Sequence, residues 1–382
     1  MKENNQFLKV VMKTIYMQRR PLAVEPITVV RHEIADGKPM CEVWFMTKGC
    51  EYDRTGGCVM CNYGKGHNVD SEAVLRQLKN SFNELPEENY NLVVNPSGSF
   101  LDENEVRREL RQGIYGLLDH ISFESLTVES RADIVTLPLL KELREHYPGK
   151  KVSVEIGVET MNPWLLKNAV NKGTTVEKIK NAVDMVHDAG LLCVANIGLG
   201  LPFINERTNI DTACQSIIKA LDIGFDSAIL FPYHVKPGTL LDIMYANGRY
   251  KCVSLWAIAA ALKNLPAEAV PSTNISWYRN YYTDKSKIVS SPETCPECAE
   301  KVLQLLDEYK AMPSADILEK LDDFKCYCHE EWKKEIANQS NKIDFRKVES
   351  DYKFIAEYFH MEKSLLKNEL KSMEDGYYAY NL

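Results

Sequence analysis

The sequence lacks a long apolar run and an export signal. Its longest uncharged apolar stretch, residues 191–204, is interrupted by an asparagine, two glycines and a proline, and is too short to cross a bilayer. Residues 1–20 mix charged with apolar side chains and so lack the unbroken apolar segment of a secretory signal. We therefore expect a cytoplasmic protein that makes no membrane contact.

An excess of basic charge is also missing. The 382 residues include 46 Lys and Arg against 54 Asp and Glu, a net charge of −8, which argues against a protein dominated by nonspecific phosphate contacts. A local basic groove stays possible, because residues 1–20 hold five basic residues against Glu3. This segment is either a polyanion contact or a solvated helix face. With 45% hydrophobic residues the composition is that of a globular protein, not a fibrous or disordered one.

Six apolar, β-branched runs alternate with amphipathic stretches along the chain. This alternation predicts right-handed βαβ units and a parallel sheet covered by helices. Six units favour a partial parallel (β/α)6 barrel over a complete eightfold one, with the chemistry at the carboxyl ends of strands that line an apolar interior. The runs are 41–46, 91–95, 125–129, 151–158, 191–198 and 227–232, and the helix patterns are 71–82, 104–118, 137–147, 175–190 and 210–224, with Ser71 and Thr174 or Thr175 as caps.

The alternating pattern ends near Pro271, where a Tyr-rich and Ser-rich segment begins. We divide the chain into an N-terminal helical extension (1–36), the partial barrel (37–270) and a C-terminal lobe (271–382). The lobe is predicted to be small, mainly helical and metal-binding, and to end in a charged helical tail.

Eleven cysteines without an export signal are unlike a disulfide framework, because cytosolic thiol pools keep such bonds reduced. Seven of them are clustered, which makes metal binding the leading interpretation. The other four lie singly in apolar surroundings and are interpreted as buried thiols. The clusters are Cys50, Cys58 and Cys61, then Cys295, Cys298, Cys326 and Cys328; the single ones are Cys41, Cys193, Cys214 and Cys252.

The early cluster lies on a glycine-containing loop just after the first predicted strand. Three thiolates there can hold three irons of a 4Fe-4S cluster and leave the fourth iron without a protein ligand. The alternative is a structural zinc loop, for which His67 offers a fourth ligand.

This loop resembles the cluster loop of radical S-adenosylmethionine (SAM) enzymes. The commonest superfamily motif has gaps of three and two residues between its cysteines, whereas the gaps here are seven and two. The wider gap is similar to the branch of archaeosine-forming radical SAM lyases, whose loop also has Gly-Gly-Cys followed by x-Met-Cys and an aromatic residue. Cys58, Met60, Cys61 and Tyr63 stand at those positions, and the resemblance implies that Met60 and Tyr63 contact SAM.

Further segments resemble the SAM-binding motifs of the same branch, over about residues 35–265. Each follows a successive predicted strand, so all would meet at one face. Taken singly, the glycines would be ordinary tight turns and the Glu-Ser-Arg strand end a surface ion pair. The resemblance implies SAM contacts from Ser97, Gly98 and Ser99, from Glu129 and Arg131, from Glu159, and from Asn196, Gly198 and Gly200.

The resemblance implies an enzyme that cleaves SAM reductively to a deoxyadenosyl radical, which abstracts hydrogen from a substrate carbon. It implies a reductant such as flavodoxin or ferredoxin. The substrate class stays open between a small metabolite, a modified nucleoside and a peptide, with C–N cleavage or rearrangement as the outcome. A tRNA-modifying lyase of archaeosine type is the alternative, so nucleic acid is a possible partner.

The four late cysteines form two pairs that can close a tetrahedral site. Structural zinc is favoured, and an auxiliary iron-sulfur cluster is the alternative, because sets of four thiolates serve both metals. His329 could replace Cys328 as a ligand. A noncatalytic module with zinc in both cysteine clusters is the competing hypothesis to an enzyme.

Two further groups have alternative interpretations. His234 is either an acid or base at the substrate or a hydrogen-bonded loop residue. The aromatic residues Trp277, Tyr278, Tyr281 and Tyr282 either stack on a substrate or pack at the barrel mouth.

Overall fold

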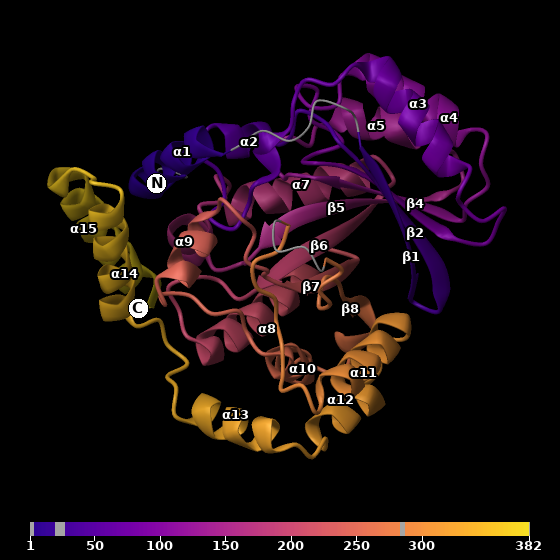
Figure 1. The fold of residues 1–382 in the computed structure, drawn as a ribbon. Helices are drawn as coiled ribbons and strands as arrows, with labels where there is room; N and C mark the ends of the chain where they lie inside the picture. The colour runs from indigo at the N-terminus through magenta and orange to yellow at the C-terminus, as the bar shows by residue number, and fades with distance from the viewer. Residues whose placement is uncertain (1–3, 20–26, 283–286, 382) are drawn as a thin grey trace.

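A computed structural model describes residues 4–19, 27–282 and 287–381. One curled sheet of eight strands runs through it in sequence order (Figure 1). The first pair is antiparallel, and every later neighbour pair is parallel. The strands are β1 (Thr28–Ala35), β2 (Lys38–Phe45), β3 (Asn91–Pro96), β4 (Ser125–Ser130), β5 (Lys151–Glu159), β6 (Leu192–Leu199), β7 (Ser227–Pro232) and β8 (Thr273–Ile275).

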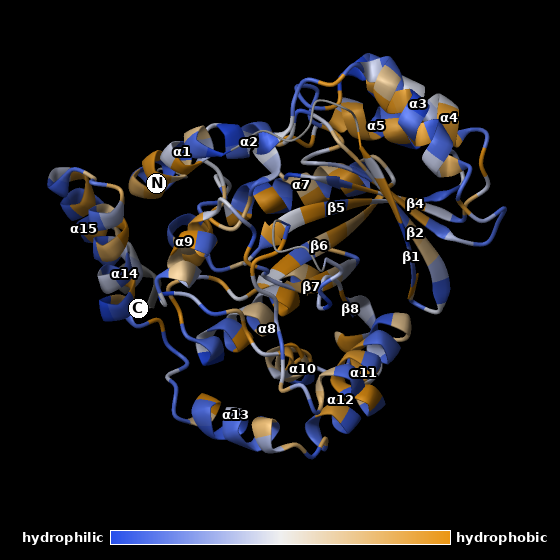
Figure 2. Ribbon diagram, in the orientation of Figure 1, coloured by the Kyte–Doolittle hydropathy of each residue, from blue (hydrophilic) through white to orange (hydrophobic). Residues whose placement is uncertain are grey.

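The predicted partial barrel is confirmed, since the six predicted runs are β2 to β7. Helices on the outside of the curl connect these strands and share one apolar core with them (Figures 1 and 2). The helices between and after the strands are α3 (Ser71–Phe82), α4 (Arg108–Leu118), α5 (Leu137–His146), α6 (Pro163–Leu165), α7 (Val176–Asp188), α8 (Glu206–Asp222), α9 (Leu240–Ala246) and α10 (Leu255–Lys263).

Alternation along the strands gives the sheet two different faces, because successive side chains of a strand point to opposite sides. On β2, Val43 packs in the helix-covered core while Glu42 lines the concave face. On β4 the same holds for Val128 and Glu129. The expected apolar interior is therefore incomplete: apolar strand residues such as Val93, Val194 and Ile229 line the concave face, but charged residues line it with them.

The C-terminal lobe is helical, as predicted, and its first part shares the core of the barrel. Its helices are α11 (Ala299–Ala311), α12 (Ala315–Asp322), α13 (Tyr327–Ala337), α14 (Phe345–Tyr358) and α15 (Lys363–Asn381). No helix within the described ranges is both long and apolar enough to span a membrane.

The two ends of the described chain lie side by side (Figure 1). Helix α1 (Gln6–Gln18) packs in a second apolar cluster with α14 and α15. The Asn5 amide donates to the Tyr352 hydroxyl at 3.0 Å, and the Gln6 backbone N–H donates to Glu369 at 3.1 Å. Helices α14 and α15 therefore hold α1 in place through packing and hydrogen bonds.

Several local features differ from the sequence-based expectation. The region 1–36 contains strand β1 as well as helix α1. Asp70, not Ser71, caps α3 by accepting from the Ala73 N–H at 2.9 Å, whereas Thr175 caps α7 as expected. Asp70 stands just before the first helical residue, and at that position an Asp or Asn side chain caps a helix well.

Candidate functional site

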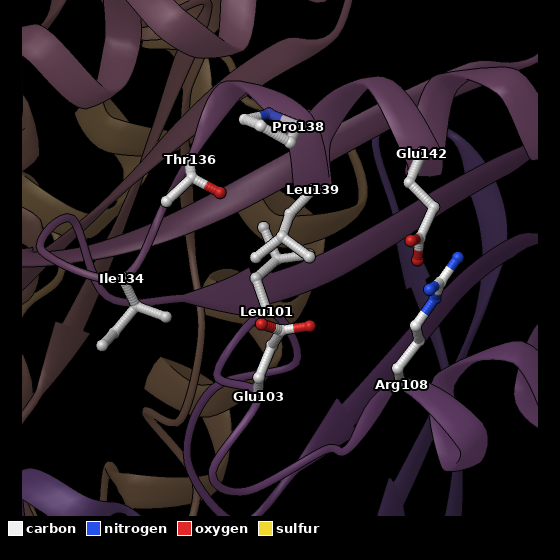
Figure 3. A pocket seen from close by; sticks show the side chains of 8 residues that line it. All are labelled: Leu101, Glu103, Arg108, Ile134, Thr136, Pro138, Leu139 and Glu142. Carbon is white, nitrogen blue, oxygen red and sulfur yellow. The ribbon is translucent and has the colours of Figure 1, made fainter.

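The concave face of the sheet bounds a cavity of about 910 Å3. All three early cysteines line it, and so do seven of the eleven residues implied as SAM contacts. The lining SAM-contact residues are Met60, Tyr63, Gly98, Glu129, Arg131, Glu159 and Asn196. A separate groove of about 500 Å3 lies between the turn after β3 and helix α5, and it contains neither a cysteine nor any of these residues (Figure 3).

The other four residues implied as SAM contacts do not line the cavity but bond to or pack against its surroundings. Ser97 accepts from the Thr47 N–H at 3.3 Å, and the Ser99 N–H donates to Glu105 at 2.8 Å. A Cβ at Gly198 would lie 2.6 Å from the Tyr233 ring, so this glycine makes room for Tyr233. Gly200, at φ +102°, accepts from the Tyr250 hydroxyl at 2.8 Å.

The cysteine loop folds back on itself after β2. The Cys50 N–H donates to the Tyr63 carbonyl at 3.2 Å, and Gly49 permits this approach, because a Cβ there would lie 1.9 Å from that oxygen. The Asp53 carboxylate accepts from the Gly64 N–H at 2.6 Å. These bonds bring all three thiols to the cavity.

Cations gather around the cysteines. The Arg131 guanidinium lies 3.8 Å from the Cys50 sulfur and 4.2 Å from the Tyr52 ring centre. The Lys236 ammonium donates to the Tyr63 hydroxyl at 2.7 Å and lies 4.0 Å from its ring centre. Burial raises the pKa of Cys58 to about 12, and the nearby Lys172 opposes that shift. A bound metal ion replaces the thiol proton, and the surrounding cations favour the thiolate form.

Carboxyl groups on β2, β4 and β5 also line the cavity. Burial raises the pKa of Glu155 to about 7, and burial together with repulsion from Glu155 and Glu42 raises the pKa of Glu129 well above its usual range. Glu155 accepts from the Asn196 amide, and Glu42 pairs with Arg31 at 3.3 Å. The cavity is thus cationic near the cysteines and acidic along β2, β4 and β5.

The early cysteines fit a cluster better than a single ion. The four late cysteines form the one group, among the described residues, whose ligand atoms all lie within 4.8 Å of one another. Cys50, Cys58 and Cys61 form no such close group within the described ranges, as expected for thiolates that each bind a different iron. His67 does not join them in such a group.

The late cysteines meet at the starts of α11 and α13, and none of them lines the cavity. Their sulfurs are 3.4 Å apart between Cys295 and Cys298 and between Cys298 and Cys328, and 3.5 Å apart from Cys326 to Cys295 and Cys328. His329 instead packs against Trp256, with ring centres 4.0 Å apart, and its Nδ1 contacts the Phe324 carbonyl. Cys328 therefore completes the group.

The two uncertain groups have structural partners. His234 contacts Ser291 at 3.0 Å and also lines the cavity, and burial lowers its pKa to about 4, so it is neutral at pH 7. Trp277 stacks on Arg31, whose guanidinium carbon lies 4.1 Å from the ring centre. The Tyr278 hydroxyl donates to Asp307 at 2.6 Å.

Comparison with known proteins agrees with this site. Residues 44–213 match the family model described as the radical SAM superfamily. The chain is 30% identical over 235 residues to the archaeosine synthase subunit beta of Thermococcus kodakarensis. The aligned region covers 59% of this chain and 72% of that protein. It is 26% identical over 257 residues to an uncharacterized protein of Methanocaldococcus jannaschii, over 65% of this chain and 70% of the relative.

The chain belongs to the radical SAM superfamily and is an enzyme of that class. Its relatives place it in a branch that resembles the archaeosine-forming enzymes. Membership implies a 4Fe-4S cluster and SAM as cofactors. Among solved structures, an archaeal Elp3 from Methanocaldococcus infernus, with its N-terminus deleted, aligns at a TM-score of 0.44 and 18% identity, over 62% of this chain and 58% of that one.

Proposed function

We propose that Cys50, Cys58 and Cys61 hold the 4Fe-4S cluster and that the substrate reacts in the charged cavity beside it. The observation that carries this is the position of all three thiols on the cavity wall, with cations around them and no fourth cysteine in reach among the described residues. When bound, the cluster and SAM supply a deoxyadenosyl radical that removes hydrogen from a substrate carbon.

For SAM, we propose contacts from the lining residues Glu129, Arg131 and Asn196, with Met60, Tyr63 and Gly98 forming the wall next to the loop. The Glu129 side chain makes no hydrogen bond or ion pair within the described part of the chain, and Arg131 lies beside Cys50. Ser97, Ser99, Gly198 and Gly200 would act by shaping the wall. The curled sheet and its helical cover exclude water from the reacting carbon, which protects a radical from quenching.

The charge of the cavity narrows the substrate. Glu129 and Glu155, whose pKa values are raised by burial, line the cavity with Glu42, and a cationic substrate group beside them would favour their charged forms, whereas an anionic group would not. We propose that a neutral or cationic, nitrogen-bearing part of a metabolite, modified nucleoside or peptide enters, with C–N cleavage or rearrangement as the outcome. The name of the Thermococcus relative supports the archaeosine-type alternative. In that case a modified base would enter while the phosphates stay outside.

For the late cysteines we propose one structural zinc ion. Tetrahedral Zn–S bonds of about 2.3 Å put the sulfurs about 3.8 Å apart. The observed 3.4 and 3.5 Å are close to that spacing. A cubic cluster needs a wider set, because each of its cysteines binds a different iron.

The decisive experiment is anaerobic reconstitution with iron and sulfide, followed by reduction in the presence of SAM. Dithionite, or a flavodoxin or ferredoxin, would supply the electron. We expect deoxyadenosine and methionine from the wild type and neither from Cys58→Ala. Cys214→Ala removes a buried thiol far from the loop in sequence and should retain turnover. Unchanged deoxyadenosine formation by Cys58→Ala would contradict the proposal.

Salt dependence separates the substrate alternatives. Binding of tRNA that weakens steeply between low and high salt would support the archaeosine-type alternative, because phosphate contacts release counterions. A flat response would count against it and favour a small substrate.

A further inference from the structure

The segment that follows β5 is bonded to both sides of Cys58. It comprises the short helix η2 (Leu166–Val170) and residues Asn171 and Lys172. The Val59 N–H donates to the Val170 carbonyl at 3.1 Å, and the Asn171 amide donates to the carbonyls of Gly56 and Gly57 at 3.0 and 2.9 Å. Residues before and after Cys58 are thus fixed to the residues just before Lys172.

Lys172 is only 8% exposed and is held in one position. Its ammonium donates to one oxygen of Glu159 at 2.8 Å, and the Tyr233 hydroxyl donates to the other at 2.7 Å. Both oxygens of Glu159 are therefore engaged within the protein. Glu159 itself adopts φ +66° next to a register shift in β5, an uncommon conformation for a residue with a side chain.

Two glycines leave space for this arrangement. A Cβ at Gly157 would lie 2.8 Å from the Lys172 ammonium, and a Cβ at Gly198 would lie 2.6 Å from the Tyr233 ring. The backbone of β5 and β6 is thus shaped around the Lys172–Glu159–Tyr233 group.

Lys172 and Cys58 line the same cavity, and the hydrogen bonds of Val59 and Asn171 keep the backbones around the two residues together. The Glu159 carboxylate, 2.8 Å from the ammonium, favours the charged form of Lys172. A fixed buried charge acts strongly, since little water screens it.

Building on the cluster assignment proposed above, we infer that Lys172 is a positioning residue that raises the reduction potential of the cluster bound at Cys58. Reduction adds one negative charge to the cluster, and a nearby ammonium stabilises the reduced form more than the oxidised form. Net charge and hydrogen bonding around the sulfurs are known to set such potentials. Glu159 binds the Lys172 ammonium, and Tyr233 binds Glu159, so the positive charge stays in one place beside the cluster.

The test is a redox titration, followed by electron paramagnetic resonance, of the reconstituted full chain without SAM. Lys172→Met should shift the midpoint potential to a more negative value, and Lys172→Arg should restore most of the wild-type value. Glu159→Gln should shift it the opposite way, to a more positive value. Lys180→Met removes the same charge from an exposed position on α7 and should leave the potential unchanged.

Iron and sulfide content is measured for every variant, which separates assembly from tuning. A fully assembled Lys172→Met protein with the wild-type potential would overturn the inference. Should Lys172→Met fail to assemble, Glu159→Gln decides alone, and a wild-type potential in that variant would overturn it. A wild-type chain that takes up no cluster at all would instead refute the proposed function.

Discussion

Arg19 and Asp53 form a buried ion pair that joins the end of α1 to the cysteine loop. The guanidinium nitrogen and the carboxylate oxygen are 2.6 Å apart, with 4% and 2% of the two side chains exposed. Arg19 also donates to the Cys61 carbonyl at 2.8 Å and to the Gly238 carbonyl at 2.7 Å. One side chain thereby fixes the loop against two other segments.

Replacing Arg19 with alanine should therefore destabilise the protein and its metal site. The carboxylate of Asp53 would stay buried without its partner, which costs about 3–5 kcal/mol. Denaturant unfolding of the iron-free protein measures this loss, and iron retained after reconstitution measures the effect on the loop. Lys13→Ala, on the exposed side of α1, is the control and should change stability by less than about 0.5 kcal/mol. Equal stability of both variants would contradict the role of Arg19.

Alanine at Gly198 should cost about 1–3 kcal/mol, because the added methyl group would collide with the Tyr233 ring. Gly116, in α4, is the matched control: nothing lies within 4 Å of a Cβ there. Alanine at Gly116 should stabilise the helix by about 0.5–1 kcal/mol. Opposite shifts in the unfolding midpoint are expected, and a stabilising Gly198→Ala would show that the ring can move away.

Glu105 should make stability depend on pH. Burial raises the pKa of this carboxyl from 4.5 to about 7. Between those values the unfolded chain releases the proton while the folded chain keeps it, so stability falls as pH rises from about 4.5 to about 7. Glu105→Gln removes this loss and should gain up to about 3 kcal/mol above pH 7. Urea unfolding of both proteins at pH 5 and pH 8 measures it; the same difference at both values would contradict the prediction.

Removing one late cysteine should remove one zinc ion per chain. Cys298 is 2% exposed, so Cys298→Ser should abolish the tetrahedral site and lower the melting temperature. Elemental analysis should show zinc lost and the iron of the early loop retained. Loss of iron in place of zinc would show that the site holds an auxiliary cluster.

The sequence predicted the elements whose signal is local. The strands β2 to β7 are apolar runs bounded by turns, and the spacing of Cys50, Cys58 and Cys61 led to the cluster loop proposed above. Strand β8 has only three residues, and β1 carries charged residues such as Arg31 and Glu33 among its apolar ones. Neither shows a clear period, which explains why both were missed.

The charged residues of the cavity were missed for another reason. Glu42 and Glu155 are single charged residues within apolar runs, Lys172 lies between Asn171 and a glycine, and any of the three could have faced solvent. Lys172 meets Glu159 and the Cys58 loop only once β5 and the segment after it are in place. Asn171 offered one clue, since asparagine readily adopts the left-handed conformation it shows here, at φ +55°.

The contacts of α1 with α14 and α15 predict which part of the protein loses its structure first. Tyr352 and Glu369 accept hydrogen bonds from the start of α1. At the other end of the helix, Arg19 donates a hydrogen bond to the Cys61 carbonyl. Removal of α14 and α15 by a protease would free α1, and with it the loop of Cys61, before the barrel unfolds. Loss of the brown iron colour should therefore precede unfolding of the barrel.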